Sequence, residues 1–216
     1  MAEKTTLKYY FSTEGETEKW YLEHLSKLIN SMPTATNKVV FNIKVCPPKS
    51  YVKRLAVLKE VNVNHFFDVE STEPEYEKRF IAVLDDMNAA ENLGKTVTCF
   101  PAYTNLTFEL WMILHKMDCN GAVDNRKNYL ALINRAFKTN YEGLKEYKEE
   151  KHFKQILNQI TIDDVKCAVA RAEKIMEENK RRSYELNKYH NYSWYKENPS
   201  TEVGSVIGKI LIACNV

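Results

Sequence analysis

Short apolar runs alternate with amphipathic segments through the first half of this 216-residue chain. Four of the runs are rich in β-branched or aromatic residues and predict strands: residues 7–11, 39–45, 80–84 and 96–100. Helical spacing of apolar positions predicts helices at residues 17–29 and 50–61 and a helical turn at 88–93. The polar, acidic stretch 62–77 predicts a loop or a short irregular helix. Strands separated by helices predict right-handed crossovers and a parallel sheet.

The second half of the chain has helical periodicity and no further strand pattern. Helices are expected at residues 106–117, 125–137, 141–157, 162–186 and 200–214. The predicted fold class is α/β, with a small parallel sheet flanked by helices and a helical C-terminal region after it. We expect a sheet domain at residues 1–104 and a helical region at 105–216. Because no Gly/Ser-rich linker separates them, we expect the two parts to pack as one body.

Composition limits the class of protein. Hydrophobic residues make up 44% of the chain and charged residues 28%, so a core can form without disulfides or structural metals. The net charge of +2 is too small to indicate a nucleic-acid partner by itself. The five cysteines are odd in number and lack metal-ligand spacing, which indicates reduced thiols and a cytoplasmic protein. The chain lacks an apolar signal core and any apolar stretch of about 20 residues, so we expect no membrane partner.

Two acidic segments follow predicted strands. Glu14 and Glu18 lie after the first strand, and Asp85, Asp86 and Asn88 lie after the run 80–84. Because carboxyl ends of parallel strands share one edge, these oxygen donors are expected to meet there. Such a set suits Mg²⁺ or Mn²⁺, with Glu14 and Asp85 as ligands and Asp86 or Asn88 assisting. The alternative is local capping of the helix after Glu14 and of a turn at Asp85. Thr13 and Glu16 also have the spacing of a capping box.

The helix expected at residues 106–117 is apolar on almost every side, which predicts that it is buried. Glu109 shares a face with Asn105, four positions before it. A buried glutamate needs a partner or a metal, so Glu109 belongs either to a structural hydrogen-bond network or to the site. His115 is expected to be a core residue, with a role in proton transfer as the alternative.

Basic and aromatic residues are interleaved in residues 180–196. Cations bind phosphates and rings stack on unpaired bases, so this segment predicts contacts with nucleic acid. The expected contact residues are Lys180, Arg181, Arg182, Lys188 and Trp194. The alternative is an exposed helix end followed by an aromatic plug in the core. The mixed Glu/Lys stretch 142–151 is most simply a solvated helix face.

Several motifs resemble a known family. Glu14-Gly15-Glu16-Thr17-Glu18 after the first strand resembles the start of a Toprim domain, and more narrowly that of the RloB-like proteins found beside restriction-modification and phage-defence genes. Two further segments are similar to signatures of that family, at Asn105-Leu106-Thr107-Phe108-Glu109-Leu110-Trp111-Met112-Ile113-Leu114-His115 and at Asn198-Pro199-Ser200-Thr201. Leu106 stands where the family usually has proline. The last segment is expected to cap the final helix, with phosphate contact as an alternative.

The resemblance implies a metal site and an activity. Toprim domains bind magnesium through a glutamate after the first strand and an Asp-x-Asp after the third, and they cut or join phosphodiester bonds. This carries the glutamate role onto Glu14 and the first aspartate role onto Asp85. Met87 departs from the second aspartate, and its thioether is a poor magnesium ligand. Asp86 or Asn88 would then take that place.

The function expected from these features is Mg²⁺- or Mn²⁺-dependent cleavage of DNA or RNA in antiphage defence. The expected catalytic residues are Glu14, Glu18 and Glu109. The resemblance also implies a partner ATPase, and it leaves self-association open. The alternative, favoured by Met87, is a non-catalytic nucleic-acid-binding or sensor subunit with a degenerate metal site. A nucleotide phosphotransferase is disfavoured because the six glycines form no phosphate-binding loop.

Overall fold

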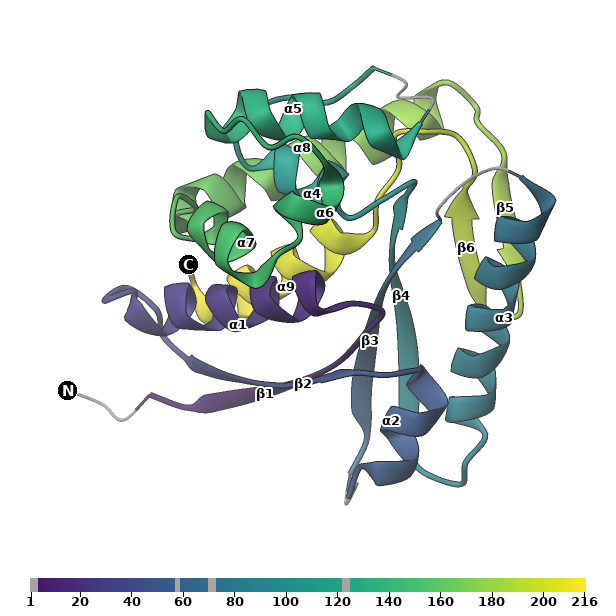
Figure 1. Cartoon of the computed structure of the whole chain (residues 1–216). Helices are drawn as coiled ribbons and strands as arrows, with labels where there is room; N and C mark the ends of the chain where they lie inside the picture. Colours follow the sequence, from purple (N-terminus) through teal and green to yellow (C-terminus); the bar gives the residue numbers. More distant parts are fainter. Residues whose placement is uncertain (1–3, 57–58, 70–72, 122–124) are drawn as a thin grey trace.

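The computed structural model describes residues 4–56, 59–69, 73–121 and 125–216, and these ranges contain a parallel sheet with helices on both faces (Figure 1). The sheet has the spatial order β2 (Lys38–Val45), β1 (Thr6–Thr13), β3 (Val61–Val69), β4 (Val97–Asn105). Every neighbouring pair of strands is parallel. The α/β class with a parallel sheet is therefore confirmed.

Three helices connect the four strands. They are α1 (Glu16–Ser31), α2 (Pro48–Arg54) and α3 (Pro74–Glu91). Figure 1 shows α1 on one face of the sheet and both α2 and α3 on the other. The chain therefore passes from β1 to β2 in one direction and returns to β3 on the opposite side of β1. This reversal creates a topological switch point between β1 and β3.

The second half of the chain is mostly helical, as predicted. Its helices are α4 (Glu109–Leu114), η1 (Arg126–Asn128), α5 (Tyr129–Phe137), α6 (Leu144–Tyr147), α7 (Glu150–Leu157), α8 (Ile162–Arg181) and α9 (Val203–Cys214). They gather over the same face of the sheet as α1 (Figure 1). One large hydrophobic cluster joins them to the sheet, and it includes the buried side chains of Phe11, Trp111 and Ile207.

A short antiparallel hairpin, β5 (Leu186–Tyr189) and β6 (Tyr192–Tyr195), was not predicted. The helix before the hairpin, α8, ends at Arg181, so it is five residues shorter than the helix expected at 162–186. The hairpin packs on the other face of the sheet, where the ring of Trp194 lies 5.0 Å from that of Phe80. Residues from the second half thus complete the core around α3. The boundary between residues 104 and 105 stays a prediction.

The largest error of the sequence prediction lies between residues 61 and 91. Residues 62–69, assigned to a loop, belong to β3, and the run 80–84, assigned to a strand, lies within α3. Pro74 occupies the first turn of α3, where its missing N–H costs nothing. Residues 70–72 of the expected loop lie outside the described residues. The expected helix 50–61 ends at Arg54, and its residues 57–58 are likewise outside.

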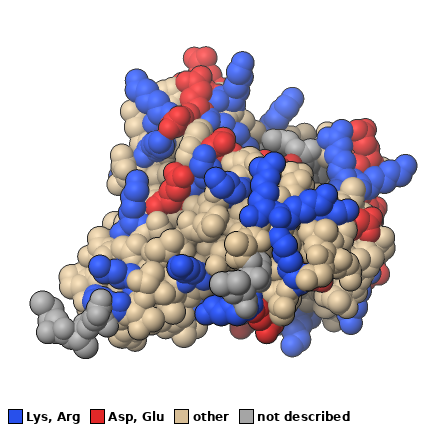
Figure 2. Space-filling view, turned by 90° about the horizontal axis from the view of Figure 1, so that it is seen from below, with Lys and Arg blue, Asp and Glu red and all other residues tan. Residues whose placement is uncertain are grey.

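The small net charge of the chain is unevenly distributed. Figure 2 shows that the face seen from below carries many more Lys and Arg than Asp and Glu side chains. Helix α2, at this end of the molecule, has Lys53 and Arg54 in its last turn. The amino ends of β3 and β4 point toward this face, so the basic surface lies away from the carboxyl edge of the sheet. No helix of the described ranges is long and apolar enough to cross a bilayer.

Candidate functional site

An acidic residue stands at the end of each strand that flanks the switch point. Glu14 directly follows β1, and Asp68 is the penultimate residue of β3. The Glu14 amide donates a hydrogen bond to the carbonyl of Phe66 at 2.9 Å. In return, Oε2 of Glu14 accepts one from the Asp68 amide at 3.1 Å. Ligands of open α/β sheets bind at this crevice, so the candidate site is here.

Glu18 reaches the same edge from the first turn of α1. Its side chain is buried, and its Oε2 accepts a hydrogen bond from the Thr17 hydroxyl at 3.1 Å. Gly15 has an extended backbone that any residue adopts, but a Cβ there would lie 2.8 Å from Oε2 of Glu18. A side chain at this position would therefore displace the Glu18 carboxylate from its observed place. The predicted capping box does not form, since Gly15 is the N-cap and the Thr13 hydroxyl donates to its carbonyl.

Glu109 begins α4 and is only 1% exposed. The Thr107 hydroxyl donates to its Oε2, and Nζ of Lys148 lies 3.0 Å from its Oε1. Lys148 directly follows α6, whose Tyr147 is fully buried. The predicted solvated face is therefore wrong at Lys148, which turns inward. We call Glu14, Glu18, Asp68 and Glu109 the acidic cluster.

The charges in this cluster act strongly on one another. Burial raises the pKa of Glu18 to about 7, while Lys148 opposes the shift and Glu109 adds to it. Burial, followed by the charge of Glu18, also raises the pKa of Asp68 well above its usual 3.8. Burial alone would lower the pKa of Lys148, but Glu109 and Asp68 outweigh it, and the pKa is raised. One ammonium group thus offsets only part of the negative charge of four carboxyl groups.

The raised pKa of Glu18 predicts that ionisation of this side chain destabilises the fold. Its stabilising contribution is complete below the usual pKa of 4.5 and is lost as the pH rises through about 7. The Glu18→Gln chain should therefore gain up to about 3 kcal/mol in free energy of unfolding, relative to the unsubstituted chain, between pH 4.5 and 8. Urea unfolding of both chains across this range measures the difference. Parallel pH profiles for the two chains would contradict the raised pKa.

Comparison with known proteins identifies the family. A family model described as RloB-like protein matches residues 9–210, nearly the whole chain. The chain belongs to the RloB-like family. No curated protein and no solved structure matches it. The family resemblance that the Glu14–Glu18 segment carried is thus confirmed.

Membership in the RloB-like family makes the third strand important, because the Toprim resemblance expects acidic residues directly after it. In the structure the third strand is β3, and the aspartate near its end is Asp68, whereas Asp85 lies within α3. The sequence there runs Asp68-Val69-Glu70, and Glu70 lies outside the described residues. Met87 is a fully buried core residue of α3. It no longer indicates a damaged metal site.

The position at which the family resemblance expects proline carries Leu106, whose backbone has φ of 62°. A proline ring fixes φ near −65°, so this conformation excludes it. The Leu106 amide also donates to the carbonyl of Val69 at 2.8 Å, a bond that proline lacks. The residue after β4 is therefore leucine in a backbone conformation that proline cannot adopt, and its amide links the end of β4 to the end of β3 by a hydrogen bond.

The acidic residues first expected at the metal have structural partners in or near α3. Asp85 is exposed, and its Oδ1 lies 2.8 Å from Nε2 of His190 on the β5–β6 turn. Oδ2 of Asp86 accepts a hydrogen bond from the Lys49 amide in the first turn of α2, so Asp86 caps another helix. Asn88 lies one turn from the end of α3. The premise that these residues follow a strand is wrong.

The predicted nucleic-acid contacts divide into exposed and buried residues. Lys180, Arg181 and Arg182 are exposed at the end of α8, and Lys188 is exposed on β5. Trp194 is buried against α3, so its ring has no free face for a base. The interpretation of that residue as part of an aromatic plug is the one that the structure supports.

His115 is a buried core residue, as the sequence predicted. Its Nδ1 lies 3.0 Å from the Trp111 carbonyl, and its Nε2 lies 3.2 Å from the Tyr21 hydroxyl. Burial lowers its pKa to about 4, which keeps the ring neutral near pH 7. In that state Nδ1 donates to the carbonyl and Nε2 accepts from the tyrosine.

The acidic cluster has the chemistry of a hard-cation site. All of its donors are oxygen atoms, which Mg²⁺ and Mn²⁺ prefer, and Lys148 brings a single positive charge to the four carboxyl groups. Within the described ranges, no three acidic, histidine or cysteine side chains already surround one metal-sized point. A cation that binds here competes with Lys148 for Glu109.

Sequence reasoning missed two members of this site. Asp68 ends an alternating run with valines at positions 61 and 63, and this period of two was the signal for a strand. Lys148 had no such signal, because Glu and Lys mix evenly around it.

Proposed function

We propose that this RloB-like chain is a metal-dependent nuclease. The observation that carries the proposal is the meeting of Glu14 and Asp68 at the switch point of a parallel sheet, with Glu18 and Glu109 beside them. This is the sheet edge at which α/β proteins bind ligands, and oxygen donors there suit a hard cation. The Toprim resemblance, which implies phosphodiester cleavage, agrees with this donor set.

Glu14, Asp68 and Glu109 are the residues that would hold the ion, which supplies polarisation of the phosphate when bound. Glu18 has a different role in this proposal. With a pKa of about 7, it is present in both protonation states near neutral pH, the condition that favours general acid–base catalysis. The Thr17 hydroxyl donates a hydrogen bond to Oε2 of Glu18. Gly15 has no side chain that would displace this oxygen. Glu18 would take a proton from the attacking group or give one to the leaving oxygen.

The biological setting belongs to the proposal and comes from the family resemblance. RloB-like proteins stand beside phage-defence genes, so we place the cleavage of DNA or RNA in antiphage defence with a partner ATPase. The basic surface of Figure 2 and the exposed cations at the end of α8 are candidate contacts for such partners.

The test combines metal and substrate. The whole chain is incubated with labelled single- and double-stranded DNA and RNA in Mg²⁺, Mn²⁺ or EDTA. We expect cleavage of one substrate class with a divalent ion and none in EDTA. Glu18→Gln should slow cleavage by about 10²- to 10⁴-fold. Intact substrates under all conditions, together with no saturable binding of millimolar metal by calorimetry, would exclude the nuclease.

A second candidate function is a non-catalytic sensor or nucleic-acid-binding subunit. The observation that favours it is the ion pair of Lys148 with Glu109, which places a protein cation within the acidic cluster. Calorimetry separates the two candidates, because the sensor needs no divalent ion. Nucleic-acid binding that is unchanged by Mg²⁺ and by Asp68→Asn would support the sensor.

A further inference from the structure

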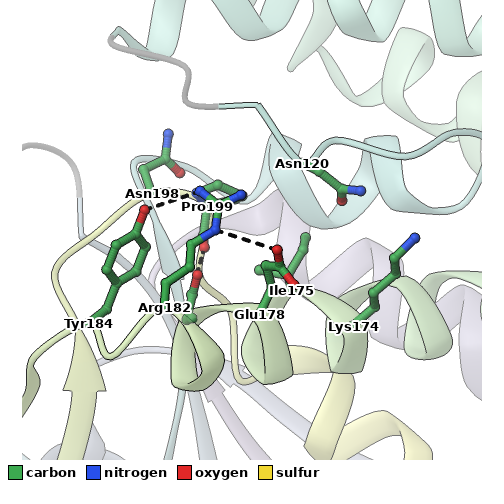
Figure 3. A pocket seen from close by; sticks show the side chains of 9 residues that line it. Asn120, Lys174, Ile175, Glu178, Arg182, Tyr184, Asn198 and Pro199 are labelled. Carbon is green, nitrogen blue, oxygen red and sulfur yellow. Dashed lines mark hydrogen bonds and ion pairs between the residues drawn. The ribbon is translucent and has the colours of Figure 1, made fainter.

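A polar pocket of about 260 Å³ lies above the C-terminal half of α8 (Figure 3). Its volume is near the lower end for ligand pockets, which suits one nucleotide unit better than a larger ligand. Helix α8 forms one side with Lys174, Glu178 and Arg182, while Asn120 and the Asn198–Pro199 segment lie opposite.

The lining has the groups that recognise a nucleotide. Lys174 has an exposed ammonium group with no ion pair among the residues that the structure describes, and it is free to bind a phosphate. Arg182 is held over the pocket by Glu178 at 3.5 Å and by the Tyr184 hydroxyl at 3.3 Å. The half-buried ring of Tyr184 offers a stacking surface for a base. The side-chain amide of Asn120 adds a hydrogen-bonding group.

The charge of the pocket selects among nucleotides. Two cations, Lys174 and Arg182, and one anion, Glu178, give the lining a net charge of +1. A phosphodiester within a strand carries a single negative charge and balances this, whereas a free nucleoside triphosphate would leave several negative charges unpaired. The balance therefore favours a nucleotide inside a nucleic-acid strand.

The pocket is connected to the acidic cluster through two side chains. Asn198 lines the pocket, and its Oδ1 accepts a hydrogen bond from the Tyr129 hydroxyl at 3.2 Å. Tyr129 is fully buried. Burial raises the pKa of its hydroxyl, and the charges of Glu109 and Asp68 add to the shift. On its other side, Pro199 is fixed by the Asn179 side-chain amide, which donates to its carbonyl at 2.9 Å. A strand in the pocket would thus pass close to the proposed cleavage site.

We propose that this pocket binds a nucleotide of the substrate strand, with the phosphate at Lys174 and the base against Tyr184. The inference rests on the proposed function, because it makes a single strand of nucleic acid the substrate of the proposed nuclease. A free nucleotide carries the same phosphate and base, so the test must separate the two sources.

The experiment measures binding apart from cleavage. Fluorescence anisotropy of a short fluorescein-labelled single-stranded oligonucleotide, as DNA and as RNA, is recorded with the full chain in EDTA. Lys174→Ala should raise the Kd about tenfold and lower the salt dependence by about one phosphate contact. Tyr184→Leu should weaken binding about tenfold, whereas Tyr184→Phe keeps the ring and most of the affinity. Lys166→Ala, an exposed lysine earlier on α8, is the matched control and should leave the Kd within about twofold.

Each outcome decides a different point. Equal effects of Lys174→Ala and Lys166→Ala would overturn the pocket. Displacement of the oligonucleotide by a mononucleotide at similar concentration would overturn the strand as the source and assign a free nucleotide. If Lys174-dependent binding persists but no metal ion supports cleavage, the pocket stands and the nuclease proposal fails.

Discussion

Replacing Asp68 by asparagine should reduce metal-dependent cleavage by about 10³-fold or more. Asp68 ends β3 at the switch point, and its carboxyl group lies within the influence of Glu14, Glu18 and Glu109. Loss of one anionic ligand removes several kcal/mol of transition-state stabilisation from a metal-dependent reaction. The rate of cleavage at saturating Mg²⁺ measures this effect, and calorimetry measures the accompanying loss of metal affinity.

The matched variant is Asp85→Asn, which decides between the site that the sequence pattern indicated and the site that the structure forms. Asp85 is exposed on α3 and pairs with His190, so its replacement should change the rate by no more than about twofold. A large loss with Asp85→Asn and none with Asp68→Asn would return the site to the original assignment and remove the switch point from the mechanism.

Replacing Lys148 by methionine should lower the free energy of unfolding by about 2 kcal/mol at pH 8. The change leaves buried Glu109 without its cation, and it removes the positive charge nearest to Glu18 and Asp68. The loss should be smaller at pH 5, because protonation of Glu18 and Asp68 removes much of the repulsion. Added Mg²⁺ should stabilise the Lys148→Met chain more than the unsubstituted one, since ion and ammonium compete for the same carboxylates.

Lys145→Met is the control for this measurement. Lys145 lies three positions earlier, on α6, and is exposed, so its loss should cost less than about 0.5 kcal/mol. Denaturant unfolding at both pH values, with and without Mg²⁺, gives all the comparisons. Equal destabilisation by the two substitutions would mean that Lys148 does not neutralise the acidic cluster.

The strands that flank the site differ in how well a sequence predicts them. β1 and β2 are rich in aromatic or β-branched residues and lie beside clear turn signals, and they were predicted within two residues of their observed ends. β3 alternates valine with asparagine at positions 61–64 and precedes an acidic stretch, so it lacked the dense apolar run by which the other strands were recognised. The run 80–84 is apolar enough for either a strand or a buried helix, and periodicity cannot separate them over five residues. One misplaced strand moved the expected aspartate from residue 68 to residue 85.

The chemistry at the site was predictable only in part. Glu14, Glu18 and Glu109 stand out because each lies in a distinctive motif, and all three reach one edge of the sheet. Lys148 could not be found, because a tertiary contact alone distinguishes it from the lysines around it. The family itself was predictable from its motifs at residues 14–18, 105–115 and 198–201, which span most of the matched residues 9–210.

Asn105 binds the returning C-terminal segment at the end of β4, which is an edge strand of the sheet. Its side-chain amide donates to the carbonyls of Tyr195, Lys196 and Glu197, and Thr104 pairs with Thr201 in an antiparallel bridge. The returning C-terminal segment thus covers hydrogen-bonding groups that an uncovered strand would offer to other chains. We therefore expect a chain that lacks this segment to leave the carboxyl end of β4 open to pairing with strands of other molecules.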